Sequence, residues 1–190
     1  MSSTTPPAPA LSTLGNVHHA AFRCRDAAQT RWFYEELLGL PLAIALALDH
    51  VSGTDQKREY MHLFFRLGDG NFLAFFDDPE RARPEQFEPK NGFDLHIALE
   101  APSREQMLAW QARLLAAGVP CRGPLDHGFV ESIYMVDPNG IQMEITCRTP
   151  RYAAILAEEG RQADHELAEW TARTRARKEA LFGAAALDQR

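Results

Sequence analysis

An internal repeat is the feature that most constrains how this chain can fold. The segment VHHAAFRCRDAAQTRWFYEELLGLP in the first half matches FDLHIALEAPSREQMLAWQARLLAAGVP in the second. In each copy a strand pattern containing a His leads into a helical pattern, which ends at Gly39 or Gly118 and is followed two residues later by proline. A repeated pattern of this kind indicates two copies of one supersecondary unit.

The two helical segments open in the same way. Asp26-x-x-Gln29 and Ser103-x-x-Gln106 are capping boxes, in which the first side chain accepts a hydrogen bond from the backbone of the fourth residue. The segments therefore start at matched positions, and we expect a helix in each half.

Each half then ends in a hairpin. YMHLFFRL-GDG-NFLAFFDD matches VESIYMVD-PNG-IQMEITCR, and Gly70 and Gly140 supply the positive φ that these turns need. Further strands are expected near 42–50 and 120–127. Both halves thus read strand, helix, strand, strand, strand, which predicts an α+β fold of two βαβββ modules with curled mixed sheets.

The predicted organisation has five parts: a disordered N-terminus (1–13), a first module (14–78), a Pro-rich charged linker (79–92), a second module (93–148) and a helical tail (149–190). The tail is expected to begin with Thr149 as N-cap and Pro150 at its first position, with an interruption at Gly160. Its helically spaced apolar residues predict that one face packs against the body or against a second copy, as in a homodimer.

Charge and composition exclude several classes of function. The net charge of −6 argues against nucleic-acid or anionic-membrane binding. No apolar stretch reaches the roughly 18 residues of a membrane span, and the start MSSTTPPAPALST lacks the features of a signal peptide. The three cysteines lack paired spacing and are interpreted as small buried residues, so a cytoplasmic location is expected.

Strand periodicity places three potential metal ligands together. In the first strand His19 alternates with His18, which should face the helix side. In the second half, the apolar residues Phe93, Leu95, Ile97 and Leu99 should pack under the helix, so His96 faces the other way. The same alternation turns Glu144 to that helix-free, concave face. The sequence therefore predicts a metal-centred cavity, although each of these residues alone is also compatible with an ordinary polar position.

Two imidazoles and one carboxylate suit Fe(II), Mn(II) or a similar ion, because three protein ligands leave positions open for substrate and dioxygen. A structural zinc site would be closed by four ligands, usually including thiolates.

These motifs also carry a family resemblance, over about residues 15–148. The strand-helix openings VHHAAFRCRDAAQTRWFYEELLGL and FDLHIALEAPSREQM and the ending DPNGIQMEI are similar to the vicinal oxygen chelate superfamily of glyoxalases, bleomycin-resistance proteins and extradiol dioxygenases. The stretch from His127 through GFVES, Tyr134 and DPNGIQM to Glu144 resembles the extradiol dioxygenase signature, with Leu125 as a departure. Glyoxalase-type members have a fourth, carboxylate ligand where this chain has Ala74, so the ligand set is closer to that of the dioxygenases. Some thiol transferases share that set.

The resemblance implies roles for further residues. Tyr134 would hydrogen-bond a substrate oxygen, and His127 would exchange protons near neutral pH. Independently of the resemblance, superposing the two halves matches His62 with Ser132, which directs His62 to the cavity as an acid, a base or a wall residue. Asn71 stands about where larger dioxygenases have another His, which puts ring cleavage in doubt.

Two other residues are candidates for substrate binding alongside Asn71. Phe64 is compatible with an aromatic substrate and equally with sheet packing. Arg23, on the face of His19, could pair with a substrate carboxylate or with an acidic neighbour.

The leading functional prediction is an Fe(II)-dependent extradiol-type dioxygenase acting with dioxygen on a small catechol-like compound. One alternative is a non-oxidative lyase, isomerase or thiol transferase that prefers Mn(II), Ni(II) or Zn(II). The other is a metal-free protein that binds an aromatic ligand.

Overall fold

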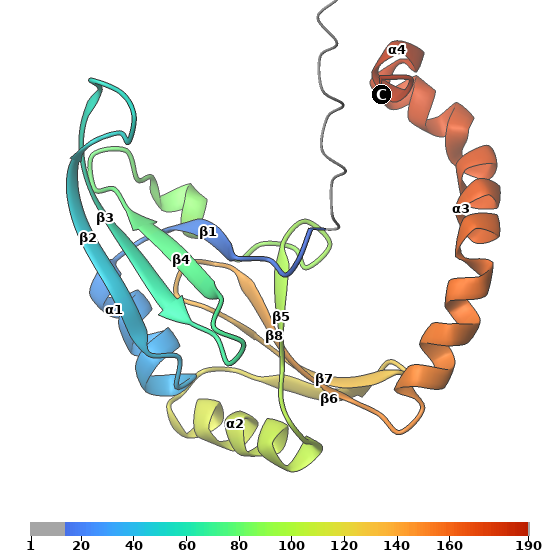
Figure 1. The fold of residues 1–190 in the computed structure, drawn as a ribbon, viewed down its shortest axis with the longest axis horizontal. Helices are drawn as coiled ribbons and strands as arrows, with labels where there is room; N and C mark the ends of the chain where they lie inside the picture. Colours follow the sequence, from blue (N-terminus) through green and yellow to red (C-terminus); the bar gives the residue numbers. More distant parts are fainter. Residues whose placement is uncertain (1–13, 190) are drawn as a thin grey trace, which may run out of the picture. The chain divides into compact units, whose positions relative to one another are not determined.

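The computed structural model describes residues 14–189 (Figure 1). The prediction for residues 1–13 lies outside this range. The first half contains β1 (His19–Cys24), α1 (Ala27–Arg31), the π-helical η1 (Trp32–Leu37), β2 (Leu42–His50), β3 (Lys57–Arg66) and β4 (Phe72–Asp77). The second contains β5 (His96–Glu100), α2 (Arg104–Ala116), β6 (Arg122–Asp126), β7 (Val130–Val136) and β8 (Gln142–Arg148). The remaining helices are η2 (Pro84–Phe87), α3 (Tyr152–Phe182) and α4 (Ala184–Leu187).

Both halves form a four-stranded sheet with the same strand order. The order is β1-β4-β3-β2 in the first sheet and β5-β8-β7-β6 in the second. In the first sheet β1 runs parallel to β4, while β3 is antiparallel to both β4 and β2. The predicted α+β class and the two related modules are confirmed, and each sheet is open, with edge strands that do not pair with each other.

The predicted capping residues start both helices. Asp26 accepts a hydrogen bond from the Gln29 backbone N–H at 2.6 Å, and Ser103 accepts one from that of Gln106 at 3.2 Å. The two glycines that follow the helices have φ of 75° and 77°, a conformation that glycine adopts without steric cost.

Aromatic packing fills the helix side of the first sheet. Tyr34 is fully buried, with its ring centroid 5.4 Å from that of Phe65 and 4.7 Å from that of Phe75. Because side chains alternate along a strand, burial of Phe65 and Phe75 on this side directs their neighbours in sequence to the other side. The helix-free face of the first sheet thereby becomes available for a site.

The turn between β7 and β8 is held by buried hydrogen bonds. Tyr34 donates its hydroxyl to Asp137 Oδ2 at 2.9 Å, and Asp137 also accepts the backbone N–H groups of Asn139 and Ile141 at 2.9 and 2.7 Å. Asn139 in turn accepts the Arg25 backbone N–H at 2.9 Å. These bonds connect the turn to η1, which contains Tyr34, and to Arg25 just before α1, although more than 100 residues separate them in sequence.

The chain divides into two compact units. Unit 1 runs up to His96 and includes Val136–Gln142, and unit 2 consists of Ile97–Met135 and the chain from Met143 onward. His19, Arg23 and His62 therefore belong to unit 1 with His96, whereas the second module supplies most of unit 2.

One sequence expectation about the start of each half is wrong. Phe93 is fully exposed instead of packed under a helix, because the strand begins only at His96 and Phe93 lies in the preceding turn. His18 is also exposed rather than buried, and its Nδ1 lies 2.9 Å from Nδ1 of His19.

The helical tail also differs from expectation at its start. The helix begins at Tyr152 with Arg151 as N-cap, and Thr149 instead donates its hydroxyl to the Gly128 carbonyl at 2.7 Å. Gly160 does not interrupt α3, because one glycine costs a helix only about 1 kcal/mol and the flanking residues favour helix. No helix in the described range is both long and apolar enough to cross a membrane.

The cysteines are not paired with one another. Cys24 and Cys147 are buried and Cys121 is half-buried. Burial raises the pKa of the Cys24 thiol to about 12, which leaves it protonated and unreactive. Cys24 and Cys147 thus fit their interpretation as small buried residues.

Candidate functional site

The helix-free face of the first sheet, termed here the open face, aligns several predicted site residues. In strand register Arg23 on β1 is opposite Phe76 on β4, and Phe76 is opposite His62 on β3. Paired residues lie on the same side of a sheet. His19 and Phe64 occupy alternate positions on the same strands, so all of them lie on the open face.

A series of ring contacts connects these side chains. The His19 and Phe64 ring centroids are 6.0 Å apart, and those of Phe64 and His62 are 4.2 Å apart. His62 also stacks on Phe76 at 3.9 Å with an interplanar angle of 22°. The structure therefore brings His19, His62 and Phe64 together, as the periodicity predicts.

His62 is held in an apolar setting. Its Nε2 is buried and has no hydrogen-bond partner among residues 14–189. Burial, and to a smaller extent the charge of His19, lower the pKa of His62 below its ordinary value. The imidazole is therefore neutral at neutral pH and offers one unused hydrogen-bonding atom.

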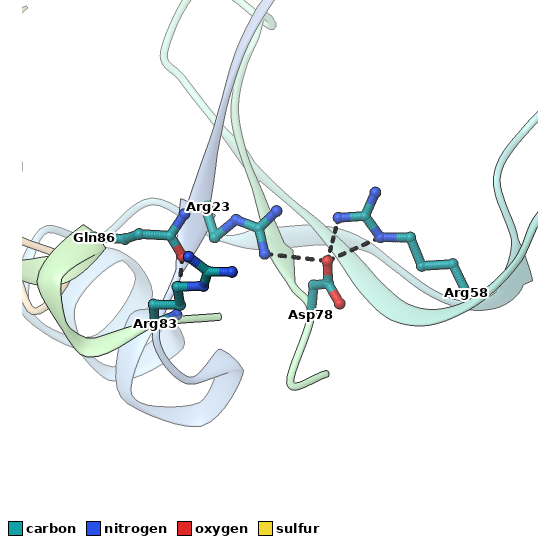
Figure 2. A network of polar contacts seen from close by, with 5 residues as sticks. All are labelled: Arg23, Arg58, Asp78, Arg83 and Gln86. Carbon is teal, nitrogen blue, oxygen red and sulfur yellow. Dashed lines mark hydrogen bonds and ion pairs between the residues drawn. The ribbon is translucent and has the colours of Figure 1, made fainter. Parts of the chain in front are cut away.

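Arg23 pairs with an acidic neighbour at the end of the open face. Its Nη1 lies 3.1 Å from Oδ2 of Asp78, and Arg58 Nε donates to the same oxygen at 2.9 Å (Figure 2). Burial raises the pKa of the Asp78 carboxyl, but the hydrogen bonds and charges of Arg58 and Arg23 outweigh this and leave that pKa below its ordinary value. Sequence reasoning missed Arg58 and Asp78, although Arg58 lies four residues before His62 on β3 and therefore on the same face of the sheet.

A second group of predicted residues meets in unit 2. Nε2 of His127 lies 2.8 Å from the Tyr134 hydroxyl. Glu144, which is only 8% exposed, acts on the same phenol through its charge and a side-chain hydrogen bond. Burial first, and then Glu144, raise the pKa of Tyr134. A carboxylate can only accept, so the Tyr134 hydroxyl donates to Glu144, and His127 donates to the Tyr134 oxygen.

Arg122 is a further member of this group that sequence reasoning missed. It is opposite Tyr134 in the β6–β7 register, and its guanidinium carbon lies 5.6 Å from the centre of the Tyr134 ring. Its charge partly offsets the rise in the Tyr134 pKa. The only sequence signal was its place in the expected strand at 120–127.

His96 is oriented by a backbone carbonyl. Its Nδ1 lies 2.7 Å from the oxygen of Gly92. A carbonyl oxygen only accepts, so Nδ1 carries the proton and, in the neutral ring, Nε2 carries a lone pair. Metal-binding histidines are commonly oriented by such a bond from the other ring nitrogen.

The three predicted ligands are divided between the units. His19 and His96 belong to unit 1 and Glu144 to unit 2. Residues 14–189 contain no group of three or more His, Cys, Asp or Glu side chains arranged to hold a metal ion. As a donor set, two imidazoles and one buried carboxylate fit a divalent transition metal.

Asn71 has a role within the hairpin turn. Its backbone N–H and its side-chain amide donate to the two carboxylate oxygens of Asp69, both at 3.0 Å. These contacts show that the polar side chain of Asn71 stabilises the turn.

Comparison with solved structures gives the same fold. A glyoxalase/dioxygenase from Nostoc punctiforme is 25% identical, with a TM-score of 0.54 over 74% of this chain and 99% of that one. A variant of the fosfomycin resistance protein FosX from Listeria monocytogenes, solved with Mn(II) and 1S,2S-dihydroxypropylphosphonic acid, is 17% identical, with a TM-score of 0.53 over 74% and 98%. TnmS3, an antibiotic-binding protein from a Streptomyces species, is 18% identical, with a TM-score of 0.53 over 73% and 100%.

No curated protein matches the sequence. A family model, however, matches residues 16–145, which is more than half of the chain and includes every residue of the candidate site. The strand order, the two repeated modules and this match lead to one conclusion: the chain belongs to the Glyoxalase/Bleomycin resistance protein/Dioxygenase superfamily.

Proposed function

We propose that the protein is a metal-dependent enzyme in which His19, His96 and Glu144 bind one divalent cation, with Fe(II) as the leading candidate. The orientation of His96 by Gly92 supports this, since it leaves a ring nitrogen with a lone pair. The buried carboxylate of Glu144 supports it as well, because carboxylate oxygens and imidazole nitrogens together are ligands that divalent transition metals accept. FosX, which shares the fold, was solved with Mn(II).

We further propose that the reaction is an extradiol-type oxygenation of a small catechol-like compound. A bound divalent metal would supply a Lewis-acidic centre with positions open to substrate and dioxygen. The observation that carries the proposal is the 2.8 Å contact between His127 and Tyr134 beside Glu144. Tyr134 would hydrogen-bond a substrate oxygen, and the exposed His127 would exchange its proton with solvent.

Oxygen consumption tests this proposal directly. Protein purified without oxygen and loaded with Fe(II) is expected to consume dioxygen with a catechol and to form a yellow ring-opened product. His96→Ala should abolish uptake, because it removes a ligand. His165→Ala is the matched control, since His165 is an exposed residue of α3 that pairs with the equally exposed Glu169, and it should leave uptake unchanged.

The alternatives give different results in the same assay. Stoichiometric metal binding without oxygen uptake would contradict ring cleavage and favour a non-oxidative enzyme using Mn(II), Ni(II) or Zn(II), as the fold shared with FosX would suggest. Absence of metal binding, with a catechol still bound equally by wild type and His96→Ala, would favour a binding protein, the class of the antibiotic-binding TnmS3.

Tyr134→Phe separates substrate chemistry from metal binding. Loss of the hydroxyl should lower kcat by about 100-fold, the usual contribution of one acid–base group. Metal content, measured by atomic absorption, should not change. A variant with wild-type kcat would show that Tyr134 is a packing residue.

We also propose a cytoplasmic homodimer. The absence of pairing among the three cysteines fits a reducing compartment. The apolar side chains exposed along α3 support contact with a second copy.

A further inference from the structure

Unit 1 contains a cavity of about 500 Å³ at one end of the open face. Its walls come from β1, β3, the end of β4 and the loop after β2, where Val51 and Ser52 lie. This volume is in the range of sites for small organic molecules. Two kinds of side chain meet there, a charged group and an aromatic group.

The charged group carries more positive than negative charge. Arg23 and Arg58 both line the cavity, and among residues 14–189 the only carboxylate that lines it is that of Asp78. Figure 2 shows the two guanidinium groups reaching Asp78 from opposite sides. One guanidinium is therefore balanced by Asp78, and the charge of the other is available to an anion.

The guanidinium groups also have hydrogen-bond donors that find no acceptor within the described part of the chain. Oδ2 of Asp78 accepts one N–H of Arg23 and two of Arg58, whereas each guanidinium has five N–H groups. The side chains of Arg23 and Arg58 are 28% and 24% exposed, so the remaining N–H groups are accessible from the cavity. Asp78 itself is 1% exposed and holds both arginines in place.

Two buried atoms beside these donors have no partner among residues 14–189. They are Oδ1 of Asp78 and Nε2 of His62, and both residues line the cavity. A buried polar atom without a hydrogen bond costs about 1–3 kcal/mol. A ligand that carries a hydroxyl group as well as its anionic group would provide the missing partner for such an atom.

The aromatic group forms a flat wall. His62 stacks on Phe76 at 3.9 Å, and the ring of Tyr60 lies 5.8 Å from that of Phe76. The same rings continue through Phe64 to His19. A planar ligand could thus lie along the open face with its anionic end at the arginines and its other end toward His19.

We propose that this cavity binds the carboxylate of a small hydroxylated aromatic acid through Arg23 and Arg58, with Asp78 as the residue that positions both guanidinium groups. The arginine pair supplies the bidentate geometry that carboxylates prefer. That this acid is the substrate rests on the function proposed above. The binding site itself does not, because every residue of the cavity belongs to unit 1 and none is a proposed metal ligand.

Calorimetric titration of the full-length protein in EDTA tests the site without any metal. The probes are 3,4-dihydroxybenzoate and its methyl ester, which has the same ring and hydroxyls but no charge. The acid should bind at least about tenfold more tightly than the ester. Equal affinities for the acid and the ester in the wild-type protein would overturn the proposal without the need for any variant.

A pair of arginine variants locates the site. Arg58→Gln should reduce the affinity for the acid by at least about tenfold and leave that for the ester unchanged. Arg66→Gln is the matched control, because Arg66 is an exposed residue of the same strand that does not line the cavity. A folded Arg58→Gln protein that binds the acid like wild type would contradict the assignment.

Failure of the two proposals can be distinguished. Tight binding of the acid by metal-free protein, with no oxygen uptake after Fe(II) loading, would contradict the dioxygenase and leave the carboxylate site intact. Oxygen uptake with catechol, but no preference for the acid in binding, would support the dioxygenase and contradict the carboxylate site.

Discussion

At the scale of single residues, the decisive interaction is the buried carboxylate of Asp78 between two arginines. Removing a carboxylate from water is unfavourable, and only close partners offset the cost. Arg23 and Arg58 approach one oxygen of Asp78 and keep its pKa below the ordinary value of 3.8. The charged form is thus preferred in the folded state, so Asp78 stabilises the fold at neutral pH.

The sign of this effect predicts a pH dependence. The pKa of Asp78 is lower in the folded state than in the unfolded state. Its contribution to the free energy of unfolding is therefore complete at pH values above the unfolded-state pKa, and it is lost as the pH falls through the folded-state pKa. Asp78→Asn should be about 2 kcal/mol less stable than wild type at pH 7, and the gap should narrow below about pH 4. Urea unfolding of both proteins at several pH values measures this difference in stability. Asp55→Asn, at an exposed position, is the control, and a gap independent of pH would contradict the account.

At the scale of elements, the two repeated hairpin turns look alike in sequence but differ in their surroundings. Gly70 and Gly140 have φ of 88° and 79°. A side chain at Gly70 would meet nothing within 4 Å, whereas a Cβ at Gly140 would lie 2.2 Å from the Glu88 carbonyl oxygen and 2.6 Å from that of Phe87. The second turn is therefore packed against the chain between the modules, and the first is open.

Alanine substitution should separate the two turns. Gly70→Ala should cost about 1–2 kcal/mol, since only the left-handed backbone is penalised. Gly140→Ala has the same backbone penalty, and its Cβ also clashes with the backbone near Glu88. It should therefore lower the free energy of unfolding by several kcal/mol or prevent folding. Thermal unfolding of both variants measures the difference. Similar melting temperatures would mean that the chain near Glu88 moves away without cost.

At the scale of the whole molecule, α3 is a long helix that buries few of its side chains. Thr174 is its only buried residue, while one stripe of the helix exposes Leu167, Trp170 and Leu181 by 65%, 50% and 75%. Their helical spacing places them on one face. A stripe of this kind is typical of a surface that binds another protein.

The proposed homodimer can be tested through this stripe. Leu167→Glu combined with Trp170→Glu should convert the dimer to a monomer in light scattering, because charge in an apolar contact is costly. Ala172→Glu adds a charge on the opposite side of the helix and should leave the dimer intact. A wild-type protein that is monomeric at high concentration would contradict the proposal.

The sequence by itself determined the features that depend on local pattern. The repeat, the caps at Asp26 and Ser103 and the alternation that puts His19, His62 and Phe64 on one face were all readable. Local hydrogen bonds and strand periodicity act over a few residues, so the residue order suffices to predict them.

Only the tertiary structure decided what meets across long separations. Asp78 and its partner Arg23 are 55 residues apart, and Tyr34 and Asp137 are 103 apart. The exposure of Phe93 and the crowding at Gly140 depend likewise on where the neighbouring chain passes. An ion pair or a steric contact acts within a few ångströms in space, and no local periodicity encodes which distant residues the folded chain brings within that range.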